Sequence, residues 1–247
     1  MLEKFLTDQE NTLSAERKLE LQSALLKIRE NVQNATKRSP YGQTPRTLLA
    51  TKTRTPEEIN FAIAQGFHLI GENRVQELLA KYDYIDKENA EIHFIGALQT
   101  NKVKYIIDKV SMIHSLDRLS LAEEINKQAK KIGKTMNVLC EVNVGDEDTK
   151  SGLSFHEVLP FLTKISTFSH LKICGLMSIP PIMTSISTQK QYFQKIMDLY
   201  IDISAKKIDN ISMNVLSIGM SSDYELAIES GSTLVRIGTA AFGSRVY

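Results

Sequence analysis

The chain contains 247 residues with 30 basic and 29 acidic side chains, so its net charge of +1 gives no field that would favour a nucleic acid or a membrane surface as partner. Hydrophobic residues make up 42% and charged residues 24%, as in an ordinary globular protein that is long enough to bury a large core. The two cysteines, Cys140 and Cys174, lie in apolar runs without a C-x-x-C pair, and we see no export leader and no 18-residue apolar stretch, so we expect a protein of the reducing cytoplasm.

The first predicted element is a long helix over residues 12–35. Its apolar side chains are spaced four, three and four residues apart, which places them on one face of a helix. They are Leu21, Leu25, Ile28 and Val32. A polar loop with two prolines follows over 36–46. The next apolar run predicts a strand over 47–52 that ends at Lys52, and Pro56 then begins a helix.

The same unit of strand and helix recurs along the rest of the chain. Strands are predicted at 67–71, 92–96, 110–114, 137–142, 171–176, 214–219 and 233–237. Asp117 is expected to cap the helix after the fourth strand, and Ile132 is expected on the apolar face of that helix. After the seventh strand, Ser222 is expected to form a capping box with Glu225.

Eight short strands that alternate with helices over about 200 residues predict an α/β fold, a closed parallel (β/α)8 or TIM barrel, rather than an open sheet. No shift in composition marks a domain boundary, so we expect one domain over 1–247, with the N-terminal helix and its loop at 1–46 and the barrel at 47–243. The longest link without a helix signal is 178–188, which we expect to act as a mobile lid.

The turns after the last two strands carry the pattern of a phosphate site. In barrels of this kind the chemistry lies at the C-terminal ends of the strands, and the loops after strands 7 and 8 often hold a phosphate. The seventh strand leads into a glycine and the hydroxyls of Ser221 and Ser222. The eighth leads through Arg236 into Gly238 and Thr239. These two consecutive turns predict an anion site.

Barrel closure makes strand 1 the neighbour of strand 8, about 4.8 Å away, so the Lys52 amine is expected to face that site. An amine beside a phosphate suggests an imine to a phosphorylated carbonyl compound, either a sugar phosphate or pyridoxal phosphate. The amine reacts when neutral, and Arg54 or Arg236, with partial burial, would lower its pKa. Aldolases on this barrel usually carry their lysine on strand 6, where residues 173–177 contain none. A lysine on strand 1 looks instead like the pyridoxal phosphate barrel of alanine racemases and ornithine-type decarboxylases.

Seven motifs occur in order between about residues 48 and 245. They lie at 50–53, 71–77, 93–102, 150–153, 175–177, 219–223 and 235–239, and the second reads Gly71-Glu72-Asn73-Arg74-Val75-Gln76-Glu77. Together they closely resemble the YggS/PROSC family of pyridoxal phosphate homeostasis proteins. The resemblance implies a single-domain barrel like the alanine racemase N-terminal domain.

The resemblance also implies a cofactor site, in which Lys52 holds pyridoxal 5′-phosphate (PLP) covalently as a Schiff base. The implied contacts are Ser221, Arg236, Gly238 and Thr239 for the phosphate, Met220 for the ring and Asn73 for the pocket wall. Whether Arg236 faces the phosphate or the ring nitrogen stays open. One departure is Ala97, where many members have histidine.

The function implied by the family is to buffer PLP and to deliver it to apo-enzymes, without a catalytic residue. Racemases of this fold take a second acid or base from an additional β domain and a partner subunit, and only eight residues follow Thr239. The alternatives are an amino-acid racemase that uses Lys52 as its base, and a sugar-phosphate lyase. Lys150 is a candidate second lysine. A monomer is expected because no apolar stripe is left over.

Three histidines on predicted strands raise the alternative of a metal hydrolase. They are His68, His93 and His114. The sequence has no H-x-H pair and no carboxylate at matching strand ends, so structural packing is favoured and no metal site is expected.

Overall fold

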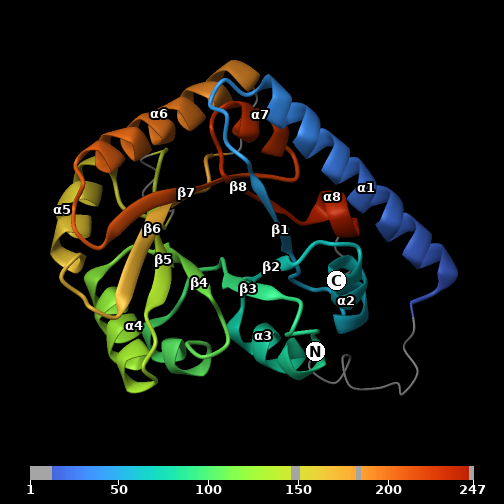
Figure 1. Ribbon diagram of the computed structural model, residues 1–247, viewed down its shortest axis with the longest axis horizontal. Helices are drawn as coiled ribbons and strands as arrows, with labels where there is room; N and C mark the ends of the chain where they lie inside the picture. The colour runs from blue at the N-terminus through green and yellow to red at the C-terminus, as the bar shows by residue number, and fades with distance from the viewer. Residues whose placement is uncertain (1–12, 146–150, 182–184, 245–247) are drawn as a thin grey trace.

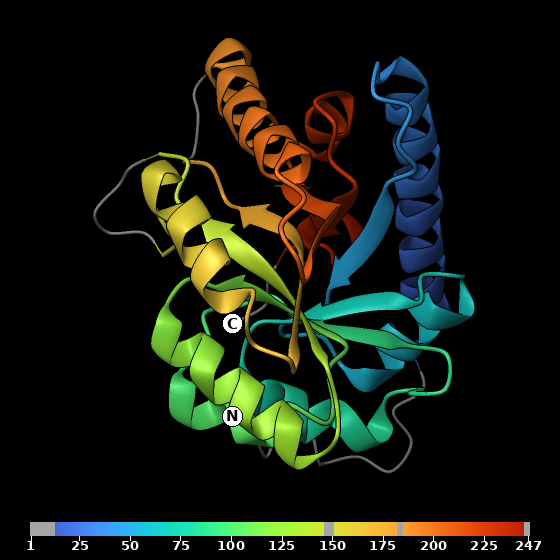
Figure 2. The same cartoon turned by 60° about the vertical axis from the view of Figure 1, so that its left-hand side comes forward.

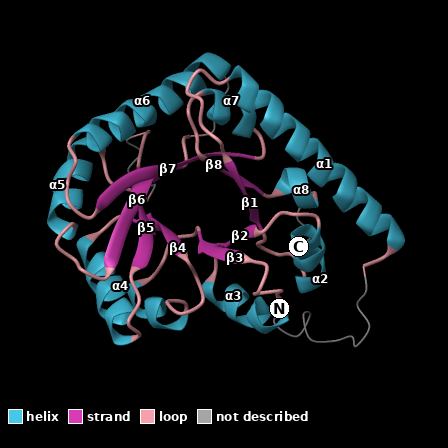
Figure 3. Ribbon diagram, viewed as in Figure 1, coloured by secondary structure: helices cyan, strands magenta, loops and turns pink. Residues whose placement is uncertain are grey.

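The computed structural model describes residues 13–145, 151–181 and 185–244. In this part of the chain, eight parallel strands pair in chain order and close into a barrel (Figure 1). Helices surround the ring of strands, as Figure 3 shows. The predicted (β/α)8 barrel with an additional N-terminal helix is confirmed.

Each predicted strand overlaps an observed one. The strands are β1 (Arg46–Ala50), β2 (Leu69–Glu72), β3 (Glu91–Phe94), β4 (Met112–Leu116), β5 (Met136–Val142), β6 (Leu171–Ser178), β7 (Ile211–Met220) and β8 (Leu234–Ile237). The α-helices are α1 (Ala15–Arg38), α2 (Pro56–Ala64), α3 (Val75–Lys81), α4 (Leu119–Lys131), α5 (Phe155–Ile165), α6 (Ile186–Ala205), α7 (Tyr224–Glu229) and α8 (Thr239–Phe242). Two 3₁₀-helices, η2 (Tyr82–Tyr84) and η3 (Thr100–Tyr105), follow α3 and β3.

The start of α4 differs from the prediction. The residue that caps this helix is Arg118, and Asp117 instead accepts a hydrogen bond from the Arg118 guanidinium at 2.7 Å. Ile132 is 48% exposed, because α4 ends at Lys131 and Ile132 lies beyond its last turn. The helix therefore begins one residue later and ends one residue earlier than the sequence pattern predicted.

The capping box predicted after β7 does not form. Asp223 caps α7, and its carboxylate accepts a hydrogen bond from the backbone N–H of Met220 at 2.5 Å. Glu225 pairs instead with Arg38 of α1 at 3.1 Å. Its side chain thus ties α7 to α1.

The link without a helix, predicted over 178–188, is shorter than predicted, because β6 extends to Ser178. Residues 182–184 lie outside the described residues, and Ile186 already belongs to α6. Among the described residues, no helix is both long enough and apolar enough to cross a membrane.

Strand register brings the two ends of the barrel together. Leu48 of β1 pairs with Arg236 of β8, and Leu49 pairs with Ile237. Because side chains alternate between the two faces of a strand, neighbouring residues point to opposite sides of the barrel wall. Leu48 packs with Leu69 and Leu234 inside the barrel.

The outer face of the same strands packs against α1. Leu49, Val235 and Ile237 form a cluster with Leu21 and Leu25 of that helix. Figures 1 and 2 show α1 running along the outside of the barrel beside β1, α7 and α8. The additional helix therefore covers the seam at which the first and last strands meet.

Candidate functional site

The turns after β7 and β8 lie against each other. Gly219 has φ +92°, and a Cβ there would come within 2.5 Å of the Ala227 Cβ, so a glycine is required for the chain to enter α7. The Ser221 Oγ then accepts hydrogen bonds from the backbone N–H groups of Gly238 at 3.0 Å and Ala240 at 3.2 Å. The structure thus brings Ser221 to the turn that contains Gly238 and the exposed Thr239.

Arg236 is buried inside the barrel, at 5% exposure. Its Nη1 donates to the carbonyl and the hydroxyl oxygen of Ser217, at 2.6 Å each, and its Nη2 donates to the carbonyl of Ser178 at 3.0 Å. Burial lowers the pKa of this guanidinium to about 10, while Glu141 and Asp223 act in the opposite direction. Arg236 therefore remains a cation at neutral pH, and β6 and β7 hold it in place. Its register partner on β7 is Met220.

A chain of hydrogen bonds crosses the barrel interior beneath Arg236. The Ser217 hydroxyl lies 3.3 Å from the Nδ1 of His114, the His114 Nε2 lies 2.9 Å from the His93 Nδ1, and the His93 Nε2 lies 2.8 Å from Glu91. Burial lowers the pKa of both histidines, so both are neutral. The Glu91 pKa falls to about 2, because His93 and Arg46 donate to the carboxylate.

These partners assign the direction of every bond in the series, which we call the lumen chain (Arg236, Ser217, His114, His93 and Glu91). Each neutral imidazole has one donor and one acceptor nitrogen. Because ionised Glu91 only accepts, His93 donates to it, His114 donates to His93 and Ser217 donates to His114.

The third histidine, His68, lies outside the barrel and is exposed, with its Nδ1 2.9 Å from the carbonyl of Asn89. No group of three possible metal ligands occurs among the described residues.

A buried carboxyl group lies at the C-terminal end of the barrel strands. Glu141, near the C-terminal end of β5, is 8% exposed. Burial, and next the charge of Asp117, raise the pKa of Glu141 to about 7, although Arg236 and Arg118 oppose the shift. Sequence reasoning missed this residue. The available signal was a single acid within the apolar run of β5.

Lys52 follows β1 by two residues and lies in a turn rather than at the end of the strand. Its side chain is partly buried. Ala50, the last residue of β1, lies beside Gly238, since a Cβ on that glycine would be 3.5 Å from the Ala50 Cβ. The alternation along β1 assigns Leu48 and Ala50 to the inner face. Lys52 therefore leaves β1 next to the turn that holds Ser221.

Of the two arginines expected near Lys52, only Arg236 lies within the barrel. The Arg54 guanidinium donates to the carbonyls of Gly243 at 2.8 Å and Ser244 at 3.3 Å, and it stacks over the Phe242 ring at 5.7 Å. Arg54 thus binds the end of α8 on the outside of the barrel wall.

Asn73 follows β2 at the same end of the barrel. Its Oδ1 is buried without a hydrogen-bond partner among the described residues. A Cβ on Gly96 would lie 2.2 Å from the Asn73 carbonyl oxygen, so the glycine allows the end of β3 to approach Asn73. An acceptor that is buried and unsatisfied is costly unless a ligand or water fills the role.

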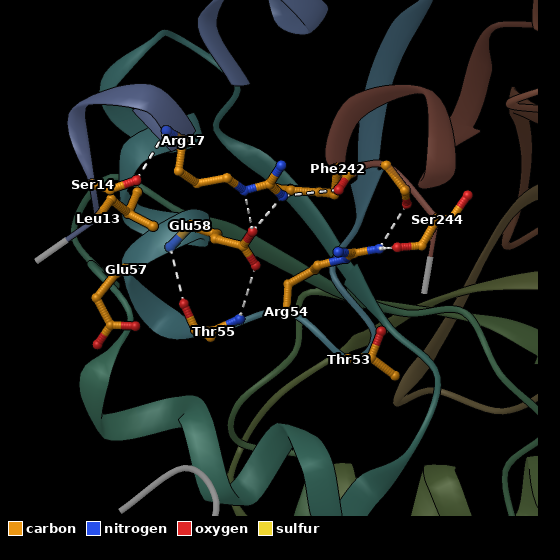
Figure 4. A pocket seen from close by; sticks show the side chains of 11 residues that line it. Leu13, Ser14, Arg17, Thr53, Arg54, Thr55, Glu57, Glu58, Phe242 and Ser244 are labelled. Carbon is orange, nitrogen blue, oxygen red and sulfur yellow. Dashed lines mark hydrogen bonds and ion pairs between the residues drawn. The ribbon is translucent and has the colours of Figure 1, made fainter. Parts of the chain in front are cut away.

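A cavity of about 670 Å³ opens beside the lysine turn, between the start of α1, the start of α2 and the end of α8. Figure 4 shows Arg17 reaching across it to Glu58, with Nε to Oε1 at 2.9 Å, and to the Phe242 carbonyl at 2.8 Å. Arg54 approaches from the other side. Both guanidinium groups are bonded to the protein, so the cavity is an outer crevice held together by these side chains.

Comparison with known proteins places this chain in a family. The family model described as the alanine racemase N-terminal domain matches residues 24–246. A protein of Aquifex aeolicus named pyridoxal phosphate homeostasis protein is 43% identical over 224 residues, which are 90% of this chain and 97% of that protein. The chain belongs to the pyridoxal phosphate homeostasis protein family. The resemblance drawn from the motifs is thereby confirmed.

Solved structures of similar proteins share the fold of this family member. A protein of Bifidobacterium adolescentis aligns with a TM-score of 0.88 and 32% identity, over 94% of this chain and 98% of that one. PipY of Synechococcus elongatus, solved with PLP bound, aligns with a TM-score of 0.80 and 27% identity, over 90% of this chain and 100% of PipY.

Proposed function

We propose that this member of the family binds PLP at the C-terminal mouth of the barrel, with Lys52 as the covalent attachment site, and that it serves PLP homeostasis. The observation that carries the proposal is the pairing of β1 with β8, which puts the lysine turn beside the turn of Ser221 and Gly238. PipY, which was solved with PLP bound, shares the fold over 90% of this chain.

The residues at the mouth fit the cofactor. Gly238 has a negative φ of −118°, and a Cβ there would meet only normal contacts at 3.5 Å, so the packing of the chain itself leaves room for a side chain at this position. A side chain would instead occupy space next to the proposed phosphate. The unsatisfied Oδ1 of Asn73 supplies a polar group for the pocket wall.

The proposed phosphate contacts follow from the chemistry of the two turns. The Ser221 oxygen accepts from two backbone N–H groups, so its own O–H is directed elsewhere and can donate to an anion. Thr239 adds an exposed hydroxyl, and the buried cation Arg236 lies beneath the turns. Because β6 and β7 hold Arg236 inside the barrel, we place its guanidinium nearer the ring than the phosphate, with Met220 beside it.

When bound, PLP supplies an aldehyde for an amine to attack and an electron-withdrawing ring. The neutral Lys52 amine adds to that aldehyde, a C=N bond forms, and one water leaves. The positive charge of Arg236 disfavours protonation of a nearby ring nitrogen, which weakens the ring as an electron sink. This electrostatic effect supports storage and delivery of the cofactor rather than turnover.

The proposal extends to the setting in which the protein works. We propose a cytoplasmic protein that acts as a monomer and passes PLP to apo-enzymes. The barrel and its additional helix form a single PLP-binding domain in this proposal. Lys150, the candidate second lysine, lies outside the described residues.

Borohydride reduction followed by peptide mass mapping tests the attachment site. Protein loaded with PLP is expected to carry a pyridoxyl group on Lys52. The Lys52→Ala variant should lose it, and Lys104→Ala, at an exposed lysine, should keep it. A colourless wild-type protein after soaking with PLP would contradict the proposal. The sugar-phosphate lyase alternative predicts no visible band.

Deuterium exchange at the α-carbon of amino acids tests the alternative of a racemase. We expect no exchange above background by the loaded protein. Exchange at about 1 per second, the lower end of ordinary enzyme turnover, would establish the racemase instead. Loss of that exchange in Glu141→Gln would then identify the second acid or base.

A further inference from the structure

A buried lysine lies directly behind the turn that carries Lys52. Lys81, the last residue of α3, is fully buried at 0% exposure. Its ammonium donates to the carbonyl of Thr51 at 2.9 Å, to Glu72 Oε1 at 3.1 Å and to Glu77 Oε1 at 2.5 Å. A buried charge requires such partners, because removal from water is expensive.

The two carboxylates reach the same turn. Glu72 Oε1 accepts from the Thr51 hydroxyl at 2.6 Å, and Glu77 Oε1 accepts from the backbone N–H of Thr53. The peptide groups on both sides of Lys52 are therefore held, through the carbonyl of Thr51 and the N–H of Thr53. We call Lys81, Glu72 and Glu77 the buried triad.

The backbone of the turn needs this support. Thr53 has φ +65°, a left-handed conformation that is a genuine outlier for a β-branched residue. Such a residue keeps that conformation only where its surroundings hold it. The triad supplies one such hold, because Glu77 binds the Thr53 N–H.

The triad lies on the opposite side of the barrel wall from the cofactor site. Along β2, side chains alternate, so Glu72 points outward while Gly71 and Asn73 belong to the inner face. Lys81 meets the outward-pointing Glu72 and donates to the Thr51 carbonyl, which precedes Lys52. The triad therefore reaches the Lys52 turn through the backbone, at the Thr51 carbonyl and the Thr53 N–H.

We infer that the buried triad of Lys81, Glu72 and Glu77 is a positioning group, which holds the Lys52 turn so that the amine meets the aldehyde of PLP. The inference rests on the proposed function of Lys52. It gives Glu72 and Glu77, the two acids of the motif at 71–77, a role in the attachment of PLP to Lys52 rather than in the general stability of the fold. Replacing a buried ionic cluster by apolar residues is often neutral for stability, so stability alone does not explain it.

Two ligands separate positioning from folding. PLP needs both the phosphate turns and the Lys52 amine, whereas pyridoxamine 5′-phosphate has no aldehyde and needs only the non-covalent contacts. A variant that misplaces Lys52 should lose affinity for PLP and form the visible band slowly, with its affinity for pyridoxamine 5′-phosphate unchanged. A variant that is merely less well folded should lose affinity for both ligands together.

Glu77 offers a matched pair of substitutions. Glu77→Leu removes the acceptor of the Thr53 N–H, and we expect PLP affinity to fall about tenfold while pyridoxamine 5′-phosphate affinity stays within twofold. Glu77→Gln keeps an amide oxygen for that N–H and should retain PLP affinity within about threefold. Parallel losses for both ligands, or equal behaviour of the two variants, would overturn the inference.

Lys81 is tested in a background that tolerates its loss. Lys81→Met alone leaves the buried Glu72 and the partly buried Glu77 without their cation, so it is combined with Glu72→Gln. We expect the same selective loss of PLP affinity, about tenfold. Lys87→Met, the same substitution at a lysine 41% exposed on the next segment, should change neither affinity.

A second substitution tests the backbone route. Thr53→Gly makes φ +65° an unstrained conformation, so the turn needs less support. In that background the effect of Glu77→Leu on PLP affinity should shrink to threefold or less. An undiminished effect would contradict transmission through Thr53.

The failure of the proposed function and the failure of the triad inference can be told apart. If wild-type protein carries no pyridoxyl group on Lys52, the proposed function fails. If it carries one and the triad variants bind PLP as wild type does, only the triad inference fails.

Discussion

At the scale of single residues, the mouth of the barrel contains a carboxyl group with a displaced pKa. Glu141 is 8% exposed, and burial raises its pKa to about 7. In the unfolded chain the same group titrates near its ordinary value of 4.5. Between these two values the folded protein holds a proton that the unfolded chain releases, so this residue makes stability fall as pH rises.

We expect Glu141→Gln to be more stable than wild type at pH 8 and equal to it below pH 4.5, where the group is protonated in both the folded and the unfolded state. A displacement from 4.5 to about 7 corresponds to about 3 kcal/mol of unfolding free energy, as an upper limit for this site. Urea unfolding of cofactor-free protein between about pH 4 and 8 measures the difference. A gap between the two proteins that does not change with pH would contradict this assignment.

Gly238 and Gly219 test the cofactor turn against the packing of the chain. Gly238→Ala should keep the unfolding free energy within about 0.5 kcal/mol, because the new Cβ meets only ordinary contacts at 3.5 Å. Its PLP affinity should fall at least about tenfold, since the Cβ occupies the proposed phosphate space.

Gly219→Ala should instead lose more than about 1 kcal/mol of stability, because φ +92° and the 2.5 Å approach to Ala227 exclude a side chain. Denaturant curves and PLP titration of both variants decide between these expectations; equal losses of stability would refute them.

Single residues also show where sequence reasoning ends. The place of Lys52 just after the first strand and the turn that contains Gly238 follow from strand period and turn pattern, so they were predictable. Lys81 was not, because a lysine at the end of a short helix normally reaches water. Its burial depends on Glu72, which comes from a neighbouring strand.

At the scale of elements, α1 closes the outside of the barrel where β1 meets β8. Its apolar face was predicted from spacing alone, and Leu21, Leu25 and Ile28 are all buried. The helix caps were less predictable. Asp117 lies one residue before the actual cap of α4, and Asp223, rather than Ser222, caps α7. Cap identity depends on the residue at which the strand-to-helix turn ends, which tertiary packing decides.

Two adjacent leucines on α1 measure how much its packing contributes. Leu25 is 1% exposed and lies in the cluster with Leu49 and Ile237, whereas Leu26 is 49% exposed. Leu25→Ala should cost about 2–5 kcal/mol of unfolding free energy, and Leu26→Ala should stay within about 0.5 kcal/mol. Denaturant unfolding of the two variants compares them directly. Similar costs would mean that α1 does not pack on the barrel as described.

At the scale of the whole molecule, the barrel interior contains the polar lumen chain. His93, His114, Ser217 and Arg236 come from four different strands and meet only because the sheet closes. The eight-strand count and the glycine and hydroxyl turns after β7 and β8 were visible in the sequence. The lumen chain was not, since the partners of each histidine are set by strand register across the barrel, which local patterns do not encode.

The lumen chain makes the whole fold sensitive to acid. Burial lowers the pKa of His93 and His114 below 6.5 in the folded protein, so the unfolded chain binds more protons as pH falls through that value. Their contribution is therefore complete above pH 6.5 and is lost on acidification. Glu91 adds a second loss between its ordinary value of 4.5 and about 2.

His114→Gln removes one of the two titrating rings while it keeps an amide donor for His93. Its unfolding free energy should fall less steeply than that of wild type between pH 6.5 and 5, by up to about 1.4 kcal/mol per pH unit, which is the value for one proton. Glu141 titrates in both proteins with the opposite sign and cancels in the comparison. If the curve of His114→Gln runs parallel to that of wild type, the buried imidazole does not change its protonation on unfolding, and the lumen chain is not neutral in the folded protein.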